Sequence, residues 1–174
     1  ASGWEFSKSS LRRMLAAAES ASQLDRAGAY RFVAACSADG FERQGALEAM
    51  CIAPNRLELA AAMIRTQDWV PQVRKAAHDA ILEAFWSPVA ELVFGLFDLI
   101  VLLKARERGH ANEAMDFVEN FLRGEVFRDL RWNQTGHRLA FVRSAAYELM
   151  LQADPDCRDD VLQRAARDPS CRIG

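Results

Sequence analysis

The sequence predicts an all-α fold, and three observations support this prediction. Alanine, leucine, glutamate and arginine, which are good helix formers, dominate the segments between turn residues. Apolar residues recur with the period of a helix, and no segment alternates apolar and polar residues as a half-buried strand does. The third observation is that arginines recur at intervals close to 30 residues or to twice that length, as expected for a repeat of helix pairs. A chain of 174 residues is long enough for one domain with a sizeable core.

Glycine, proline and Asp/Asn residues divide the chain into segments of about 10 to 17 residues, each with helical periodicity. Pro71, Pro88 and Pro155 are expected in first turns, where proline lacks only a hydrogen bond that the helix does not need. Ser87 and Asp154 are expected to cap two of these helices. The expected helices are Ser10–Ala21, Gln23–Ser37, Phe41–Ile52, Asn55–Thr66, Pro71–Phe85, Pro88–Ala105, Asn112–Arg123, Gly136–Gln152 and Pro155–Arg167.

Three of these segments share a pattern of small and large residues behind an arginine. After Arg43, Arg74 and Arg143, small residues stand at the first two apolar positions and mostly larger ones follow. Small residues at those positions let a neighbouring helix approach closely. With Arg172, these arginines are separated by 31, 69 and 29 residues, which corresponds to one, two and one period of a repeat. Each period holds two helices, the pattern of an α-solenoid.

Residues 68–77, DWVPQVRKAA, resemble the inter-helix turn and second-helix start of a HEAT repeat. The Asp-Pro-Ser at 168–170 is similar to the same turn in bacterial HEAT-like proteins. This resemblance implies a right-handed superhelix of stacked antiparallel helix pairs. It also implies a structural ladder of turn aspartates and helix arginines between adjacent repeats, with Asp68 and Arg74 as members and Arg43 and Arg143 at equivalent positions.

We expect residues 1–174 to form a single α-solenoid domain. Residues 1–38 are expected to be an N-terminal helix pair, and residues 39–174 to be HEAT-like repeats of which the last is truncated. Because the last turn is followed by so few residues, we expect the chain to be a fragment of a longer solenoid. Two departures from the HEAT pattern are Glu42, where valine is usual, and the lack of an aspartate six residues before Arg143.

Composition and charge argue against several classes of function. The chain has 22 basic and 24 acidic residues, so its net charge of −2 gives no overall attraction to nucleic acid or an acidic membrane. The apolar run from Val89 to Leu103 is shorter than the ~20 residues of a membrane helix and contains Glu91 and Asp98. The four cysteines form no CxxC pair, so we expect free thiols in a reducing, cytoplasmic protein.

The sequence contains no motif that predicts catalysis. It lacks GxSxG, HExxH and a glycine-rich phosphate loop, so we expect neither enzymatic activity nor a cofactor. HEAT-like deoxyhypusine hydroxylases bind metal through His-Glu pairs, whereas this chain offers only His78-Asp79. Neighbouring residues on a helix do not face each other, so no metal site is expected. Nothing in the chain indicates a bilin, the ligand of the HEAT-like phycobilin lyases.

The alternative to a protein-binding role is DNA binding, as in HEAT-like alkylpurine DNA glycosylases. Arginine with aromatic residues suits phosphates and stacked bases. Such residues cluster at Arg123, Arg128, Arg131, Arg138 and Arg143, with Phe127 and Trp132 among them. Asp129, near Trp132, is the local candidate for a catalytic carboxylate. Against this alternative, acidic residues balance the arginines, and 19 of the 22 basic residues are arginine, which indicates a compositional bias.

We therefore expect a non-catalytic scaffold for protein–protein interaction, whose partner is another protein or another domain of a longer chain. In a solenoid the second helices line the concave face, so their outward residues form a continuous strip. The expected partner-binding residues are Lys75, His78, Asp79, Leu82, Tyr147, Glu148 and Leu151, with Gln44, Leu47, Glu48 and Cys51 at the equivalent positions of a third helix. Trp69 and Trp132, both near turns, are expected to cover the core.

Overall fold

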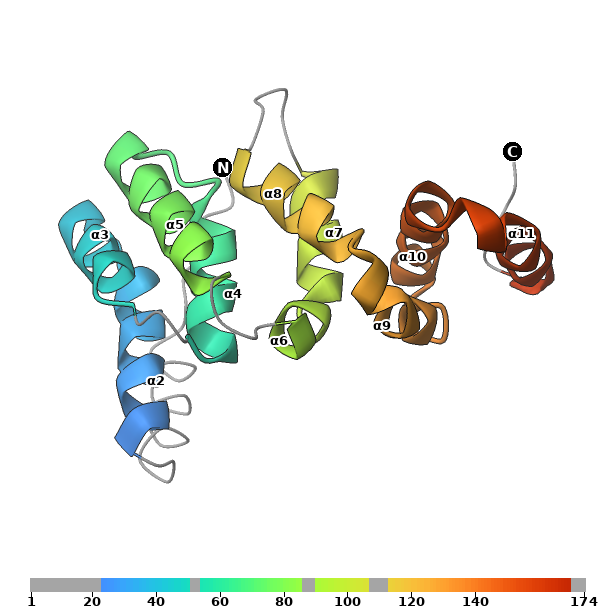
Figure 1. Cartoon of the computed structure of the whole chain (residues 1–174). Helices are drawn as coiled ribbons and strands as arrows, with labels where there is room; N and C mark the ends of the chain where they lie inside the picture. Colours follow the sequence, from blue (N-terminus) through green and yellow to red (C-terminus); the bar gives the residue numbers. More distant parts are fainter. Residues whose placement is uncertain (1–22, 51–53, 86–89, 107–112, 170–174) are drawn as a thin grey trace. The chain divides into compact units, whose positions relative to one another are not determined.

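The computed structural model describes residues 23–50, 54–85, 90–106 and 113–169. Throughout these ranges the secondary structure is helical and contains no strand (Figure 1), so the all-α prediction is confirmed. The predicted helix Ser10–Ala21 and the predicted cap Ser87 lie outside the described residues. Within the same ranges, no helix is both long enough and apolar enough to cross a bilayer.

The chain divides into two compact units, Ala1–Ser87 and Pro88–Gly174. In the first unit, α2 packs on α3 and α4, and α5 packs on the same two helices. Consecutive helix pairs therefore lie side by side, with α2 and α4 in one layer and α3 and α5 in the other (Figure 1). The four helices are α2 (Gln23–Ala35), α3 (Gly40–Glu48), α4 (Arg56–Arg65) and α5 (Pro71–Ala84).

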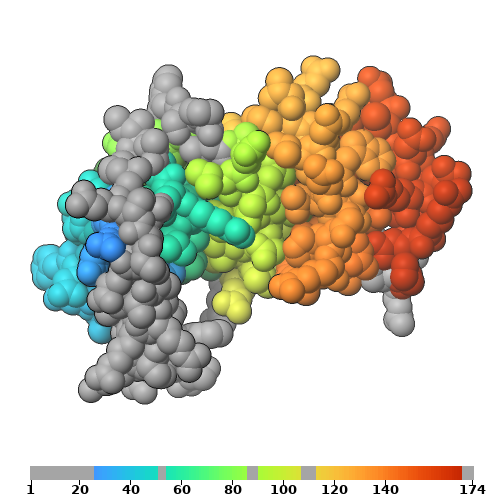
Figure 2. All heavy atoms as spheres, turned by 90° about the horizontal axis from the view of Figure 1, so that it is seen from below, coloured from blue at the N-terminus to red at the C-terminus, as the bar shows by residue number. Residues whose placement is uncertain are grey.

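In the second unit the long helix α10 contacts α7, α9 and α11, and α6 contacts α9. In the space-filling view, the side chains of α10 and α11, orange to red, meet (Figure 2). The elements of this unit are α6 (Ala90–Phe94), α7 (Phe97–Ala105), α8 (Glu113–Leu122), the short 3-10 helix η1 (Glu125–Phe127), α9 (Arg128–Gln134), α10 (Ala140–Ala153), the 3-10 helix η2 (Pro155–Cys157) and α11 (Arg158–Arg167).

Local capping explains where several helices begin. Asn55 accepts hydrogen bonds from the amides of Leu57 and Glu58, while the Glu58 carboxylate accepts from the Asn55 amide at 2.9 Å, which completes a capping box for α4. Asp39 caps α3 by accepting from the Phe41 amide at 2.8 Å. These side chains satisfy donors that the first turn leaves unpaired.

Other helix boundaries differ from the predictions. The segment expected as one helix, Pro88–Ala105, is two helices, α6 and α7, separated at Gly95 and Leu96, because glycine weakens a helix interior. The helix α3 ends at Glu48, before the predicted Ile52, and α9 was not predicted as a separate helix. Asp154 makes no side-chain cap, because its carboxylate is bound to arginines instead.

Small side chains occupy much of the packing surface between helices. In the first unit, Ala35, Ala46 and Ala61 form a buried cluster against which Phe32 and Met50 pack. In the second unit, the cluster is larger in volume and consists of Tyr147, Met150, Val161 and Ala165, with Trp132, Leu151 and Cys157 packed against it. Alanine at a helix interface lets two backbones approach closely, as the sequence pattern predicts.

Two glycines provide a matched test of this packing. A Cβ on Gly28, in α2, would lie 2.8 Å from Cγ of Asn55 and would displace the side chain that caps α4. Gly28→Ala should therefore lower the free energy of unfolding by about 1–3 kcal/mol. A Cβ on Gly45, in α3, meets nothing within 4 Å, so Gly45→Ala should raise it by about 0.5–1 kcal/mol through helix propensity. Urea unfolding followed by circular dichroism measures both, and equal effects of the two variants would contradict the packing described.

Candidate functional site

Three arginine–aspartate pairs recur at the same place in different helices. Each arginine is the fourth residue of its helix and binds both oxygens of an aspartate that lies 23 to 25 residues later in the chain. The donor–acceptor distances of the Nε and Nη2 bonds are 2.9 and 3.1 Å for Arg43–Asp68, 3.0 and 2.8 Å for Arg131–Asp154, and 2.6 and 3.1 Å for Arg143–Asp168. The planar guanidinium matches the carboxylate in this two-bond geometry.

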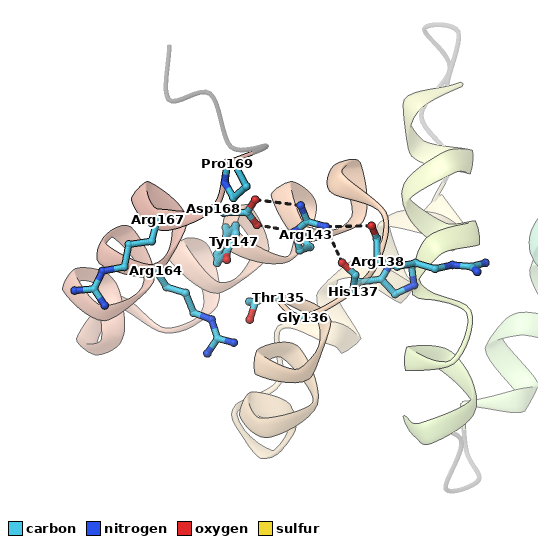
Figure 3. A pocket seen from close by; sticks show the side chains of 10 residues that line it. All are labelled: Thr135, Gly136, His137, Arg138, Arg143, Tyr147, Arg164, Arg167, Asp168 and Pro169. Carbon is cyan, nitrogen blue, oxygen red and sulfur yellow. Dashed lines mark hydrogen bonds and ion pairs between the residues drawn. The ribbon is translucent and has the colours of Figure 1, made fainter.

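The remaining donor of each guanidinium binds the chain that precedes its helix. Nη1 of Arg43 donates to the carbonyl oxygens of Ser37 and Ala38 at 3.0 and 2.8 Å. Nη1 of Arg143 donates in the same way to those of His137 and Arg138, at 2.8 and 3.2 Å (Figure 3). The two arginines thus join three segments each, namely their own helix, the turn before it and the aspartate of the following turn.

Arg131 makes the most buried of these connections. Its side chain has no exposed surface, and Nη1 donates to the carbonyl oxygens of Leu122 and Gly124 at 2.8 and 2.7 Å. Asp154 is also buried and accepts from Arg128 as well. Removal of one partner of a buried ion pair leaves the other charge buried without a counter-charge, which is strongly destabilising. The geometry indicates a structural role for these residues.

The pairs Arg43–Asp68 and Arg143–Asp168 join consecutive helix pairs, as a ladder would, but Asp68 and Arg74 do not bind each other through their side chains. The Asp68 carboxylate binds Arg43 and Arg65 and accepts from the Val70 amide, whereas Arg74 donates to the backbone oxygens of Asp68 and Trp69. The carboxylate of a turn is therefore reached by the arginine that precedes it in the chain, not by Arg74. The sequence reasoning also missed the Arg131–Asp154 pair, although its spacing of 23 residues resembles the 25 of the other two.

Most arginines of the candidate DNA-binding cluster are occupied within the protein. Arg123 binds Glu119, Asn120 and Gln152, while Arg128, Arg131 and Arg143 bind the aspartates described above. Arg138 is exposed and makes no ion pair within the described ranges.

The aromatic residues of that cluster pack within the protein, whereas its carboxylate lies at the surface. Phe127 packs against Phe121 and Phe94, with ring centroids 4.7 and 6.0 Å apart. Trp132 packs against the core cluster of the second unit, whereas Asp129 is exposed.

The predicted partner-binding strip lies partly at the surface. On α5, Lys75 is exposed and forms a 2.6 Å ion pair with Asp79, and His78 and Leu82 are half-buried.

On α10 the prediction needs a correction. Glu148 is exposed and Leu151 is half-buried, but Tyr147 is only 5% exposed because Val161 and Ala165 of α11 cover it. On α3, Gln44 is half-buried and Glu48 is exposed, whereas Leu47 is buried in the core. Cys51 lies outside the described residues.

Two aromatic side chains are exposed where the sequence predicted no binding residue. Phe41 is 88% exposed and Trp69 is 82% exposed, so Trp69 does not cover the core as expected. Both stand at the N-terminal ends of neighbouring helices, Phe41 in α3 and Trp69 just before α5. Arg43 connects them, since it lies in the same turn as Phe41 and its guanidinium carbon is 6.0 Å from the centre of the Trp69 ring. We call Phe41 and Trp69 the aromatic pair.

A shallow cleft of about 520 Å³ lies in the second unit, beside α10 and the C-terminal end of α11 (Figure 3). We call it the basic cleft, because four of the residues that line it are arginines and one is an aspartate. The lining residues are Thr135, Gly136, His137, Arg138, Arg143, Tyr147, Arg164, Arg167, Asp168 and Pro169. This arrangement of charges can bind an anionic group.

Comparison with known proteins gives no match. No protein-family model, no curated protein and no solved structure is similar to this chain. Among the residues that the structure describes, no three histidine, cysteine, aspartate or glutamate side chains are grouped so that they could hold a metal ion.

The Asp68 pair predicts how stability depends on pH. Burial raises the pKa of Asp68, but the Val70 amide, Arg43 and Arg65 outweigh burial and hold this pKa below its ordinary value. A lowered pKa contributes stability that is complete above about pH 4 and is lost as the pH falls through the folded-state pKa. Asp68→Asn should therefore lower the free energy of unfolding by about 3–5 kcal/mol at pH 7 and by less near pH 3.

Asp79→Asn is the control for this measurement, because Asp79 is in an exposed pair with Lys75 and should change stability by less than about 1 kcal/mol. Urea unfolding at both pH values compares the variants with the wild type. A difference between Asp68→Asn and the wild type that stays constant from pH 7 to pH 3 would contradict the assignment.

Substitution by lysine should lower the free energy of unfolding much more at Arg131 than at Arg138. Lysine cannot form the two-bond contact to Asp154 or reach two carbonyl oxygens at once, so Arg131→Lys should cost about 2–4 kcal/mol of unfolding free energy. Arg138→Lys, on an exposed side chain, should change it by less than about 0.5 kcal/mol. Thermal and urea unfolding of both variants test the structural role, which fails if the two losses are equal.

Proposed function

We propose that this chain is a HEAT-like α-solenoid scaffold that acts by binding another protein and has no catalytic role. Two features support the solenoid. The helix pairs of the first unit stack side by side, and the same arginine–aspartate geometry recurs in both units. Repeated helix pairs of this kind present a long surface made of successive second helices, which suits recognition of another macromolecule.

The aromatic pair is the observation that carries the proposal of protein binding. Single exposed apolar residues are common on protein surfaces. Phe41 and Trp69, however, are both almost fully exposed and stand at the same end of two packed helices. Tryptophan and other aromatic residues dominate the energetics of protein interfaces, since each buries a large area at a small entropic cost. We therefore place the centre of the interface on this pair.

The outer face of α5 extends this surface with polar groups. Lys75, His78, Asp79 and Leu82 lie further along the same helix that follows Trp69, and all retain exposed or half-exposed side chains. Interfaces combine a central aromatic anchor with a polar rim, and this face supplies such a rim. In the second unit, Glu148 and Leu151 of α10 stay as separate candidate contacts, whereas Tyr147 does not because it is buried.

DNA binding is the less supported function. A groove for duplex DNA requires arginines whose charge is available to phosphates. Four of the five arginines that suggested such a groove are instead bound to aspartate, glutamate or backbone oxygens of the chain itself. The arginine content is therefore better explained by the repeated structural pairs than by a nucleic-acid surface.

The double variant Phe41→Ser/Trp69→Ser tests the interface. The wild-type chain and the variant are used as bait after crosslinking in cells, and bound proteins are quantified by mass spectrometry. A partner centred on these residues should be retained at least ~30-fold less by the double variant, since a single hot-spot residue already contributes about 2 kcal/mol.

Val126→Ser is the control, because Val126 is 85% exposed and lies in the second unit. This variant should retain the partner at the wild-type level, and circular dichroism should show that all three proteins are equally folded. Equal retention by the double variant would contradict the aromatic pair as the interface. Tight, salt-dependent binding of a 20-base-pair duplex would instead support the DNA alternative.

A further inference from the structure

The basic cleft of the second unit carries positive charge that no described residue neutralises. Arg143 and Asp168, which line it, are bound to each other. Arg138, Arg164 and Arg167 also line it, all three are exposed, and none makes an ion pair within the described ranges. Arg138 is the member of the cluster at 123–143 without an ion pair to a described residue, and together with Arg164 and Arg167 it leaves three guanidinium groups for a ligand.

Arg164 is held in place for binding. Its guanidinium carbon lies 5.3 Å from the centre of the Trp132 ring, so the ring covers one face of the planar group. Stacking on a ring leaves the N–H edges of a guanidinium open, and these edges are the groups that bind carboxylates. Figure 3 shows the Arg164 side chain directed toward Thr135 across the cleft.

The three guanidinium groups do not converge on one point. In Figure 3, the side chains of Arg138 and Arg167 project to opposite sides of the cleft, with Arg164 between them. A single small anion could reach one of them at a time. A segment with several acidic side chains could reach all three, so this spread favours an extended, multiply charged ligand.

The floor of the cleft is rigid. Arg143 binds Asp168 and the carbonyl oxygens of His137 and Arg138, which fixes the turn before α10 relative to the end of α11. Tyr147 is buried between these elements and closes the base of the cleft. A site built on a rigid frame loses little entropy when a ligand binds.

The charge distribution along α11 selects among anionic ligands. Asp159 and Asp160 in the first turn of this helix and Asp156 just before it are exposed and outnumber Arg158 there, whereas Arg164 and Arg167 stand at its C-terminal end. A helix of 10 residues is about 15 Å long. Duplex DNA carries a charge every ~1.7 Å of its axis, so a duplex along α11 would meet the acidic end as well. A short acidic peptide can occupy the basic end alone.

We propose that the basic cleft binds an acidic peptide segment of a partner protein, through carboxylate contacts to Arg138, Arg164 and Arg167. This site is separate from the aromatic pair, which lies in the other unit. It can therefore be tested independently of the interface on Phe41 and Trp69.

The test measures binding of fluorescein-labelled hexaglutamate to the full 174-residue chain by fluorescence anisotropy at low salt. We expect saturable binding that weakens as salt is added. Arg164→Ala should weaken it by about five-fold, and Arg164→Ala/Arg167→Ala by about 25-fold if the two contacts are independent.

Arg158→Ala is the matched control, because Arg158 is exposed on the first turn of the same helix and does not line the cleft. It removes the same charge as Arg164→Ala and should leave the affinity within about two-fold of the wild type, since it is remote from the ligand. Equal losses for these two variants, or no saturable binding of hexaglutamate, would overturn the proposal. Tighter binding of a duplex of equal charge than of hexaglutamate would overturn the assignment to a peptide.

Discussion

The arginine–aspartate pair is the interaction on which the arrangement of the helices depends. Each guanidinium binds a later aspartate with two bonds and an earlier turn with its remaining donor, so three separate segments meet at one side chain. The pairs are buried or half-buried, and a partly satisfied pair would leave a charge without solvent. Any other register between neighbouring helices would break these contacts. The pairs therefore favour one stacking arrangement over its alternatives.

This use of arginine also decides how charge is distributed on the surface. Many of the arginines whose sequence pattern suggests a nucleic-acid groove instead form ion pairs within the protein, and aspartates neutralise their charge. Three exposed arginines without an ion pair to a described residue, namely Arg138, Arg164 and Arg167, line the basic cleft. A local excess of positive charge on a chain of net charge −2 favours a short acidic ligand over a long polyanion.

The close packing of helices through alanines is one reason why two aromatic side chains of the first unit remain exposed. The helices of the first unit meet through small residues such as Ala35, Ala46 and Ala61, which leave little room for a large ring between them. Phe41 and Trp69 stand at helix starts, outside these contacts, and remain exposed. Burial of two rings against another protein would be strongly favourable, so this end of the first unit is suited to association.

Features that depend on residues close together in the chain could be predicted from the amino-acid sequence. Helical periodicity and local caps placed α4 and α5 almost to the residue, because Asn55, Glu58 and Pro71 act within one turn. Only the packing of one helix on another determines which groups from different helices meet. It paired Asp68 with Arg43 in place of Arg74, and it buried Tyr147 beneath α11. Periodicity shows that a helix has an apolar and a polar face, but the neighbouring helices determine which side chains are buried.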